Sequence, residues 1–169
     1  MPSRGFWECL KRLEELFNSI GGAVRVAYRE LLNSSCSVIC VYSTLRLLLE
    51  ASVQYAYYLL MGFSEHDLLS LVARRERSYA SFTATMVKRL KGVHGSRKKW
   101  ILRTYLRLGE YTHPTTKVWS GALILDEDLL VEALDAVTYV LLFARRDLRK
   151  LFPRNHCRLS KTLKLLEES

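Results

Sequence analysis

One short segment, RLGEYTHP at residues 107–114, carries side chains that could do acid–base chemistry on a phosphate ester. The imidazole of His113 can take or give a proton near neutral pH, and the guanidinium of Arg107 can hold the charge of a phosphorane. A straight helix would put the two on different sides, because six steps of about 100° fall far from a full turn. We expect the helix to fray at Gly109 and to end before Pro114, which brings His113 back to Arg107. The alternative is that His113 only ends a helix and bonds a carbonyl.

A cationic stripe precedes this pair. Lys99, Arg103 and Arg107 follow one another at i, i+4 and i+8, which is one face of a helix, and Arg97 and Lys98 stand at its start. Such a stripe can track a phosphate backbone, so the sequence predicts nucleic-acid binding here. A solvated helix face would have the same pattern and stays open as the alternative.

An ion pair is predicted inside an apolar helix, where Arg46 and Glu50 are spaced i, i+4 in LRLLLEA. The plain interpretation is a buried pair that fixes the register of neighbouring helices. The alternative is that the pair shapes the pocket around Arg107 and His113. We group Glu110 with Arg46 and Glu50 as a supporting polar core.

The sequence predicts neither a metal site nor a cofactor, since it lacks metal-ligand spacing and a glycine-rich phosphate loop. Its scattered cysteines are expected to be small core residues of a reducing compartment: Cys9, Cys36, Cys40 and Cys157. The start of the chain is amphipathic and charged, without a secretory signal, and no apolar run suits a membrane span. We therefore expect a cytoplasmic protein. The scarcity of amides, one Gln and three Asn, is typical of thermophilic sources.

The formal net charge of +9 favours an anionic partner such as nucleic acid. From residue 74 to residue 107 there are eleven Lys or Arg residues and a single acid, Glu76. The stretch from 110 to 135 is acidic, and the chain becomes basic again from Arg145. The excess positive charge is therefore concentrated in the middle third of the chain.

The elements that position these residues are all predicted to be helices. At 169 residues with 49% hydrophobic content, the chain fits one domain with its own core. Apolar spacing and end signals predict one kinked helix or two within 4–32, interrupted at Gly21-Gly22, and further helices over 37–62, 65–90, 96–112 and 126–150. Ser64 and Asp67 form a capping-box pattern, Ser96 is expected to cap the fourth helix, and residues 151–169 are expected to be a basic tail. The predicted fold is an all-α, up-and-down antiparallel bundle of four to five helices.

These motifs together resemble the HEPN superfamily. The likeness consists of a long helix with the Arg46 and Glu50 pair, a helix ending in Tyr111, His113 and Pro114, and one more long helix. It covers about residues 36 to 145, which places a HEPN-like core at about 36–150 between the amphipathic N-terminal segment and the basic tail. The chain departs from the ribonuclease members at Leu108, where they commonly carry a polar residue directly after the arginine.

The resemblance implies an RNA-directed domain. Many HEPN domains are metal-independent endoribonucleases of toxin and defence systems, which use an arginine and a histidine separated by four to six residues, as Arg107 and His113 are. They usually act as homodimers with two motifs facing each other. The alternative function is a non-catalytic helical module that binds nucleic acid, or an antitoxin-like or regulatory protein partner.

Overall fold

The computed structural model describes residues 2–33, 37–68, 83–112 and 125–168, and within these ranges every regular element is a helix. The all-α prediction is confirmed. The elements are α1 (Arg4–Arg12), α2 (Glu14–Asn18), α3 (Gly22–Leu32), α4 (Val38–Leu60), η1 (Glu65–Asp67), α6 (Thr83–Arg89), α7 (Gly95–Thr112), α9 (Glu127–Ala144), η2 (Arg146–Leu151) and α10 (Ser160–Glu167).

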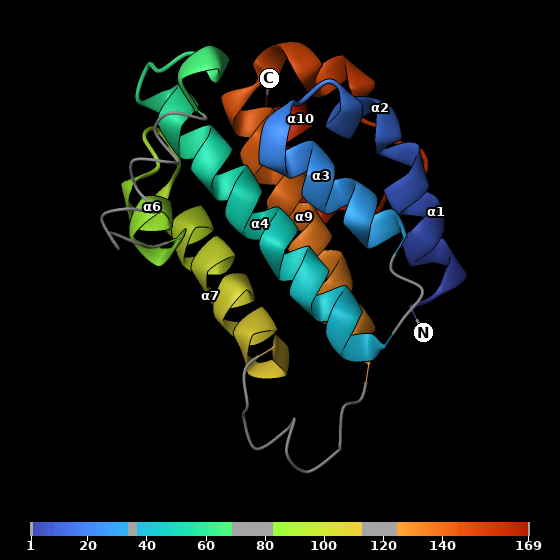
Figure 1. Cartoon of the computed structure of the whole chain (residues 1–169). Coiled ribbons are helices and arrows are strands. Elements are labelled where there is room, and N and C mark those ends of the chain that lie inside the picture. Colours follow the sequence, from blue (N-terminus) through green and yellow to red (C-terminus); the bar gives the residue numbers. More distant parts are fainter. Residues whose placement is uncertain (1, 34–36, 69–82, 113–124, 169) are drawn as a thin grey trace.

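The helix α4 lies at the centre, as its nearly all-round apolar sequence predicts. It contacts α3, α6, α7 and α9. In Figure 1, α4 lies between α3 and α7 with α9 behind it, and α3 and α7 run opposite to α4 and α9. Ser37 caps its start by accepting a hydrogen bond from the Cys40 amide, and Gly62 follows its end with φ of 90°, a left-handed conformation that suits glycine.

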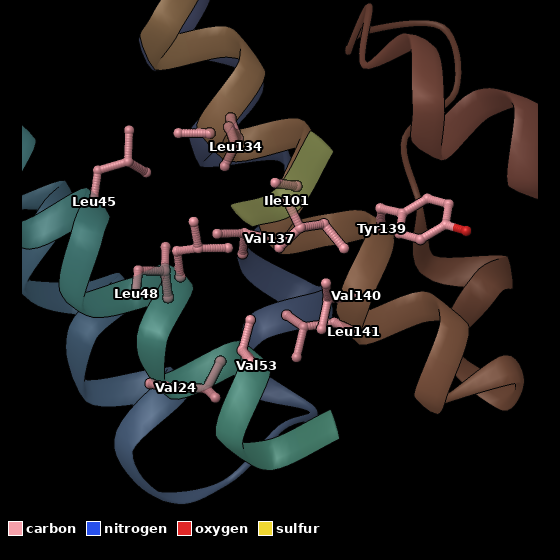
Figure 2. Packing of buried hydrophobic residues seen from close by; sticks show 14 of the residues in the cluster. Val24, Leu45, Leu48, Val53, Ile101, Leu134, Val137, Tyr139, Val140 and Leu141 are labelled. Atoms are coloured by element: carbon pink, nitrogen blue, oxygen red, sulfur yellow. The ribbon is translucent and has the colours of Figure 1, made fainter. Parts of the chain in front are cut away.

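The core is formed where α4 meets α9. Leu45, Leu48 and Val53 of α4 point toward Leu134, Val137, Val140 and Leu141 of α9, with Ile101 of α7 and Val24 of α3 beside them (Figure 2). These side chains are almost wholly buried. Their burial supplies the main apolar driving force that holds the four long helices together.

The N-terminal segment is broken twice. One kinked helix or two are expected within residues 4–32, and the structure has three: α1 ends at Arg12 with Leu13 as its C-cap, and α3 begins at Gly22, whose φ is 63°. The amphipathic character predicted for the start of the chain is confirmed, because its apolar residues at three- and four-residue spacing are all buried: Phe6, Leu10, Leu13, Phe17 and Ile20.

The predicted helix over 65–90 is described only at its two ends, by η1 and α6, because residues 69–82 lie outside the described residues. The capping box of Ser64 and Asp67 is confirmed. The cap expected at Ser96 is wrong, because α7 already begins at Gly95. His94 takes that role, with its Nδ1 3.3 Å from the donating Ser96 amide.

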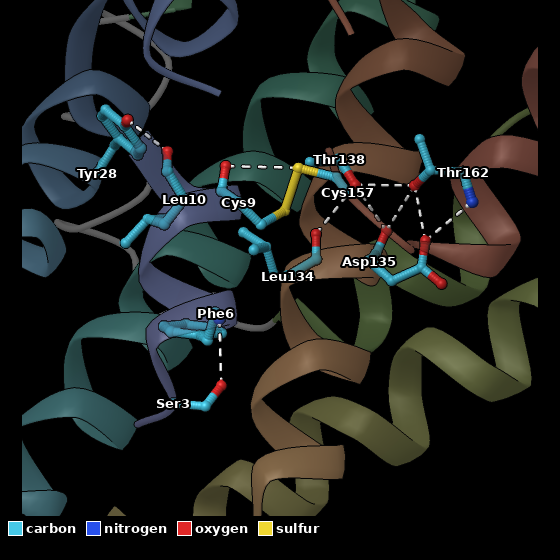
Figure 3. Close-up of a disulfide and its surroundings, with 10 residues drawn as sticks. All are labelled: Ser3, Phe6, Cys9, Leu10, Tyr28, Leu134, Asp135, Thr138, Cys157 and Thr162. Carbon is cyan, nitrogen blue, oxygen red and sulfur yellow. Dashed lines mark hydrogen bonds between the residues drawn. A yellow bond between two sulfur atoms is a disulfide. The ribbon is translucent and has the colours of Figure 1, made fainter. Parts of the chain in front are cut away.

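Residues 151–169, which are predicted to be a basic tail, include a helix that was not predicted. Residues 160–167 form α10, which packs on α9. Asp135 of α9 caps this helix, although it stands far from it in the sequence. Its carboxylate accepts hydrogen bonds from the Lys161 amide at 2.9 Å and from the Thr162 amide at 2.8 Å, the second of which is drawn in Figure 3. The cap was missed because the residue that makes it stands far away in the sequence.

The expectation of free core cysteines is also wrong. Cys9 and Cys157 are buried as predicted, but they form a disulfide with a Cα–Cα distance of 5.1 Å (Figure 3). Cys40 is disulfide-bonded as well, and no described cysteine is a free thiol. The Cys9–Cys157 bond joins α1 to the segment between η2 and α10, so it holds two distant ends of the chain together.

Candidate nucleic-acid interface

Arg107, the predicted phosphate clamp, is engaged by two carboxylates. Its Nη1 donates to Glu132 Oε2 at 2.8 Å and its Nη2 to Asp126 Oδ2 at 2.9 Å. The side chain is 38% exposed, so both contacts lie near the surface between α7 and the start of α9. A phosphate on Arg107 would therefore have to displace two acidic partners.

Asp126 is also the N-cap of α9. Its second oxygen accepts a hydrogen bond from the Leu129 amide at 2.9 Å, while its own amide donates to Tyr42 Oη at 2.7 Å. Tyr42 stacks on Tyr111, with 4.3 Å between ring centroids, and burial raises the pKa of Tyr42 to about 12, so the phenol stays protonated at neutral pH. Arg107 thus belongs to a network that fixes where α9 begins.

The pairing predicted for Arg46 and Glu50 is confirmed, with Nε 3.2 Å from Oε1, but the pair is half-buried and not fully buried. The guanidinium also crosses to α7. Its Nη1 donates to Thr112 Oγ1 and its Nη2 to Tyr105 Oη, both at 2.9 Å, and it lies 4.8 Å from the centre of the Tyr105 ring. Arg46 is therefore the cation that reaches the last described residue of α7.

The two arginines meet different faces of α7. Tyr105 and Thr112, seven residues apart, share the face toward α4, whereas Arg107 is turned by about 200° from Tyr105 and meets α9. The expected fraying at Gly109 is wrong, because α7 continues to Thr112. His113 lies outside the described residues, so its approach to Arg107 stays a prediction.

Glu110 does not lie beside Arg46 and Glu50 in a buried polar core. Glu110 is exposed on α7 and has an interaction partner. Glu110 stands five residues after Tyr105 and two before Thr112. At about 100° per residue it is turned well away from the face of α7 that meets Arg46. The grouping of Glu110 with the other two is therefore corrected.

Two cations of the predicted stripe are paired with an acid of α9. Arg103 is 67% exposed, and its Nη2 donates to Glu132 Oε1 at 3.0 Å, so Glu132 holds both Arg103 and Arg107. Arg97 lies 5.8 Å from the centre of the Tyr139 ring. Of the predicted stripe, only Lys99 is exposed with no ion pair or hydrogen bond to the described residues.

A second set of cations lies where α6 meets α7. Lys98 Nζ donates to the backbone carbonyl of Lys88 at 3.2 Å, which brings the end of α6 to the start of α7. We define the α6–α7 basic corner as Lys88, Arg89, Lys91, Lys98 and Lys99. The sequence has no Asp or Glu between residues 83 and 109, and no ion pair among the described residues involves this corner. Sequence reasoning counted these charges but did not separate them from the arginines that α9 neutralises.

No family model, curated protein or solved structure matches the chain. Within the described ranges, no group of three or more His, Cys, Asp or Glu side chains is arranged to hold a metal ion. Nor does any helix in that part of the chain have both the length and the apolarity to span a membrane. The interface is therefore interpreted from its own geometry.

Proposed function

We propose that this chain is a HEPN-like, RNA-directed helical domain that binds single-stranded RNA at the α6–α7 basic corner. The observation that carries the proposal is the contrast between the two cationic regions of α7. Arg103 and Arg107 are held by acids of α9, whereas the corner has no acidic partner among the described residues. Unpaired exposed cations can replace the counterions of a phosphate backbone, whereas neutralised ones must first break an ion pair.

The test is a salt titration of RNA affinity, measured by fluorescence anisotropy with a labelled single-stranded oligonucleotide. The test variant replaces Lys88, Arg89 and Lys91 with Gln. The matched control replaces Lys11, Arg25 and Arg29, which are equally exposed but lie on α1 and α3. Each phosphate contact contributes about 0.7 to the slope of log K against log salt, so the test variant should lose about 2 units of slope and the control almost none. Equal losses in both variants, or no binding by the unmodified protein at low salt, would reject the proposal.

A second candidate function is a metal-independent endoribonuclease. It is favoured by the contact of Arg46 with Thr112, the residue directly before His113 in the sequence. In this candidate His113 is the general acid or base, and Arg46, which pairs with the carboxylate of Glu50, faces the phosphate in place of Arg107, which pairs with two carboxylates.

Cleavage assays with chelator present distinguish the arrangements. If Arg46 is the arginine that faces the phosphate, the Arg107→Ala variant should keep most of the cleavage activity and the His113→Ala variant should lose it. If the original pairing of Arg107 with His113 is right, both substitutions abolish it. An unmodified protein that binds RNA without cleaving it is the non-catalytic module of the first proposal.

The finer architecture belongs to the same proposal. We propose that α4, α7 and α9 belong to the HEPN-like core at about 36–150 and that α3 completes an up-and-down bundle with them. We also propose that the protein is a homodimer or has an antitoxin-like or regulatory partner. The exposed side chains of Leu47 on α4 and Leu106 on α7 support an additional contact, since they are 51% and 58% exposed. Light scattering after gel filtration tests for a homodimer.

A cytoplasmic location also stays a proposal, and the disulfide restricts it. Buried disulfides are rare in the cytosol of most organisms, but intracellular proteins of hyperthermophiles are rich in them. The cytoplasmic and thermophilic assignments therefore depend on each other. A Tm above about 90 °C supports both, and a Tm in the mesophilic range of about 45–65 °C counts against both.

A further inference from the structure

A groove with opposite charges at its two ends lies between α7, α9 and the start of α10. Its volume is about 260 Å³, just below the range of about 300–1,000 Å³ that is usual for small-molecule sites. Trp100 of α7 and Val131 of α9 supply its apolar surface. The groove can therefore accept only a small ligand.

Its central charges are already satisfied. Glu132 lines the middle of the groove with both oxygens bonded to arginines, and Arg103 is one of those arginines. The buried Asp135 accepts hydrogen bonds from two α10 amides and from Thr162 Oγ1. A ligand gains little by approaching these groups, so recognition falls to the two ends.

At one end lies Asp128, an exposed carboxylate in the first turn of α9 that makes no ion pair or hydrogen bond with the described residues. At the other end lie Arg158 and Lys161, beside the hydroxyl of Ser160. The two ends are separated along α9. The backbone amide of Lys161 donates a hydrogen bond to Asp135, which places the start of α10 beside that residue. Asp135 stands seven residues after Asp128, which is about 10 Å along a helix axis.

We infer that this groove binds a zwitterionic peptide of two to three residues, with its amino group at Asp128 and its carboxylate at Arg158 and Lys161. An extended chain spans at most about 3.3–3.6 Å per residue, so three residues match the separation of the ends. The lining contains three acids and three bases and is formally neutral, which disfavours a nucleotide with two negative charges and suits a ligand without net charge. Small apolar side chains of the peptide rest on Trp100 and Val131.

The probe is trialanine, compared with N-acetyl-trialanine and trialanine amide, because each cap removes one charge of the ligand. Binding is followed by NMR through the indole Nε1–H resonance of Trp100. Solvent-exposed charge pairs are worth up to about 1 kcal/mol, so each cap should weaken binding about threefold to fivefold.

Variants of the groove test which protein side chains bind the amino group of the peptide and which bind its carboxylate. Asp128→Asn should remove the difference between trialanine and its acetylated form, while the amide stays weaker. Arg158→Gln with Lys161→Gln should remove the difference between trialanine and its amide, while the acetylated form stays weaker. The matched control is Arg154→Gln with Lys164→Gln, two exposed cations outside the groove, which should change neither difference.

Several outcomes would overturn the inference. They are no perturbation of Trp100 by trialanine at millimolar concentration, equal binding of all three peptides, and preferential binding of guanosine or uridine monophosphate at the same resonance. RNA binding at the α6–α7 basic corner is measured separately, so failure here leaves the proposed function standing.

Discussion

At Arg107 the guanidinium bonds to both Asp126, the N-cap of α9, and Glu132, which lies in the second turn of that helix. The residue type and its distance from His113 suggested a phosphate clamp. Its observed partners give it a different task, which is to join α7 to the N-cap of α9. The sequence around Arg107 does not show which acids a neighbouring helix places beside it. The ion pairs of Arg107 could therefore not be predicted from the sequence.

Arg107→Ala should therefore lower stability more than it lowers RNA affinity. The ion pairs are partly exposed, so the expected loss in the free energy of unfolding is about 1 kcal/mol. Urea unfolding measures the loss, and anisotropy measures the affinity, which should stay within about twofold of the unmodified protein. Stability that does not change, combined with RNA binding that disappears, would restore Arg107 as a phosphate ligand.

Asp147 provides a pH-dependent contribution. Both its oxygens accept hydrogen bonds from Arg145, at 2.9 and 2.8 Å, and these bonds hold the pKa of Asp147 below its usual 3.8. A carboxyl with a lowered pKa stabilises the folded state above its unfolded pKa, and the effect is lost as the pH falls through the folded pKa. The difference in unfolding free energy between the unmodified protein and Asp147→Asn should thus be present at neutral pH and vanish below pH 3.8. Urea titrations across this range test it, and a difference that grows toward low pH would contradict it.

Among the elements, the long helices were well predicted, because their end signals lie within a few residues of the helix. Gly62 and Asp126 mark ends that the structure confirms, whereas the last helix, predicted over 126–150, ends at Ala144 and is followed by η2. The short helix α10 carries no such local signal. Leu159, its N-cap residue, makes no side-chain capping bond, and the cap comes from Asp135 on another helix. A cap supplied across that distance leaves no pattern in the sequence around α10.

Asp135→Ala should therefore act mainly on α10. The substitution removes a cap and leaves the Lys161 and Thr162 amides without their acceptor, which should cost about 2–4 kcal/mol. The Thr162 hydroxyl loses its bond to the carboxylate but keeps those to the residue 135 carbonyl and to Thr138. Amide hydrogen exchange should show protection falling first in residues 160–167. Ser160→Ala is the control, because Ser160 is exposed and its side chain makes no capping bond. Uniform loss of protection over α4 and α9 as well would show that Asp135 supports the whole core instead.

Across the whole molecule, the all-helical fold followed from composition and apolar spacing, whereas the Cys9–Cys157 bond did not. The two cysteines are 148 residues apart, and four cysteines in a sequence can pair in several ways or stay reduced. Their burial was predicted correctly, but burial is shared by free thiols and disulfides. Only the spatial approach of α1 to the segment before α10 decides between the two.

Removing this bond should cost considerable stability. Closing a loop of more than one hundred residues lowers the entropy of the unfolded chain by an amount worth about 4–5 kcal/mol, so Cys9→Ala with Cys157→Ala should lower the free energy of unfolding by about that much. Urea unfolding without reductant measures it, and the single variant Cys9→Ala should lose a similar amount. If the double variant unfolds at the same urea concentration as the unmodified protein, the bond does not contribute to stability.

The same covalent link has a mechanical consequence. A pulling force applied to the chain on either side of residues 9–157 would pass through the two sulfur atoms, and the backbone enclosed between them would carry almost no load. Under tension only the segments outside that span could lengthen, including α10, while α3, α4, α7 and α9 would stay folded until a reductant opened the bridge.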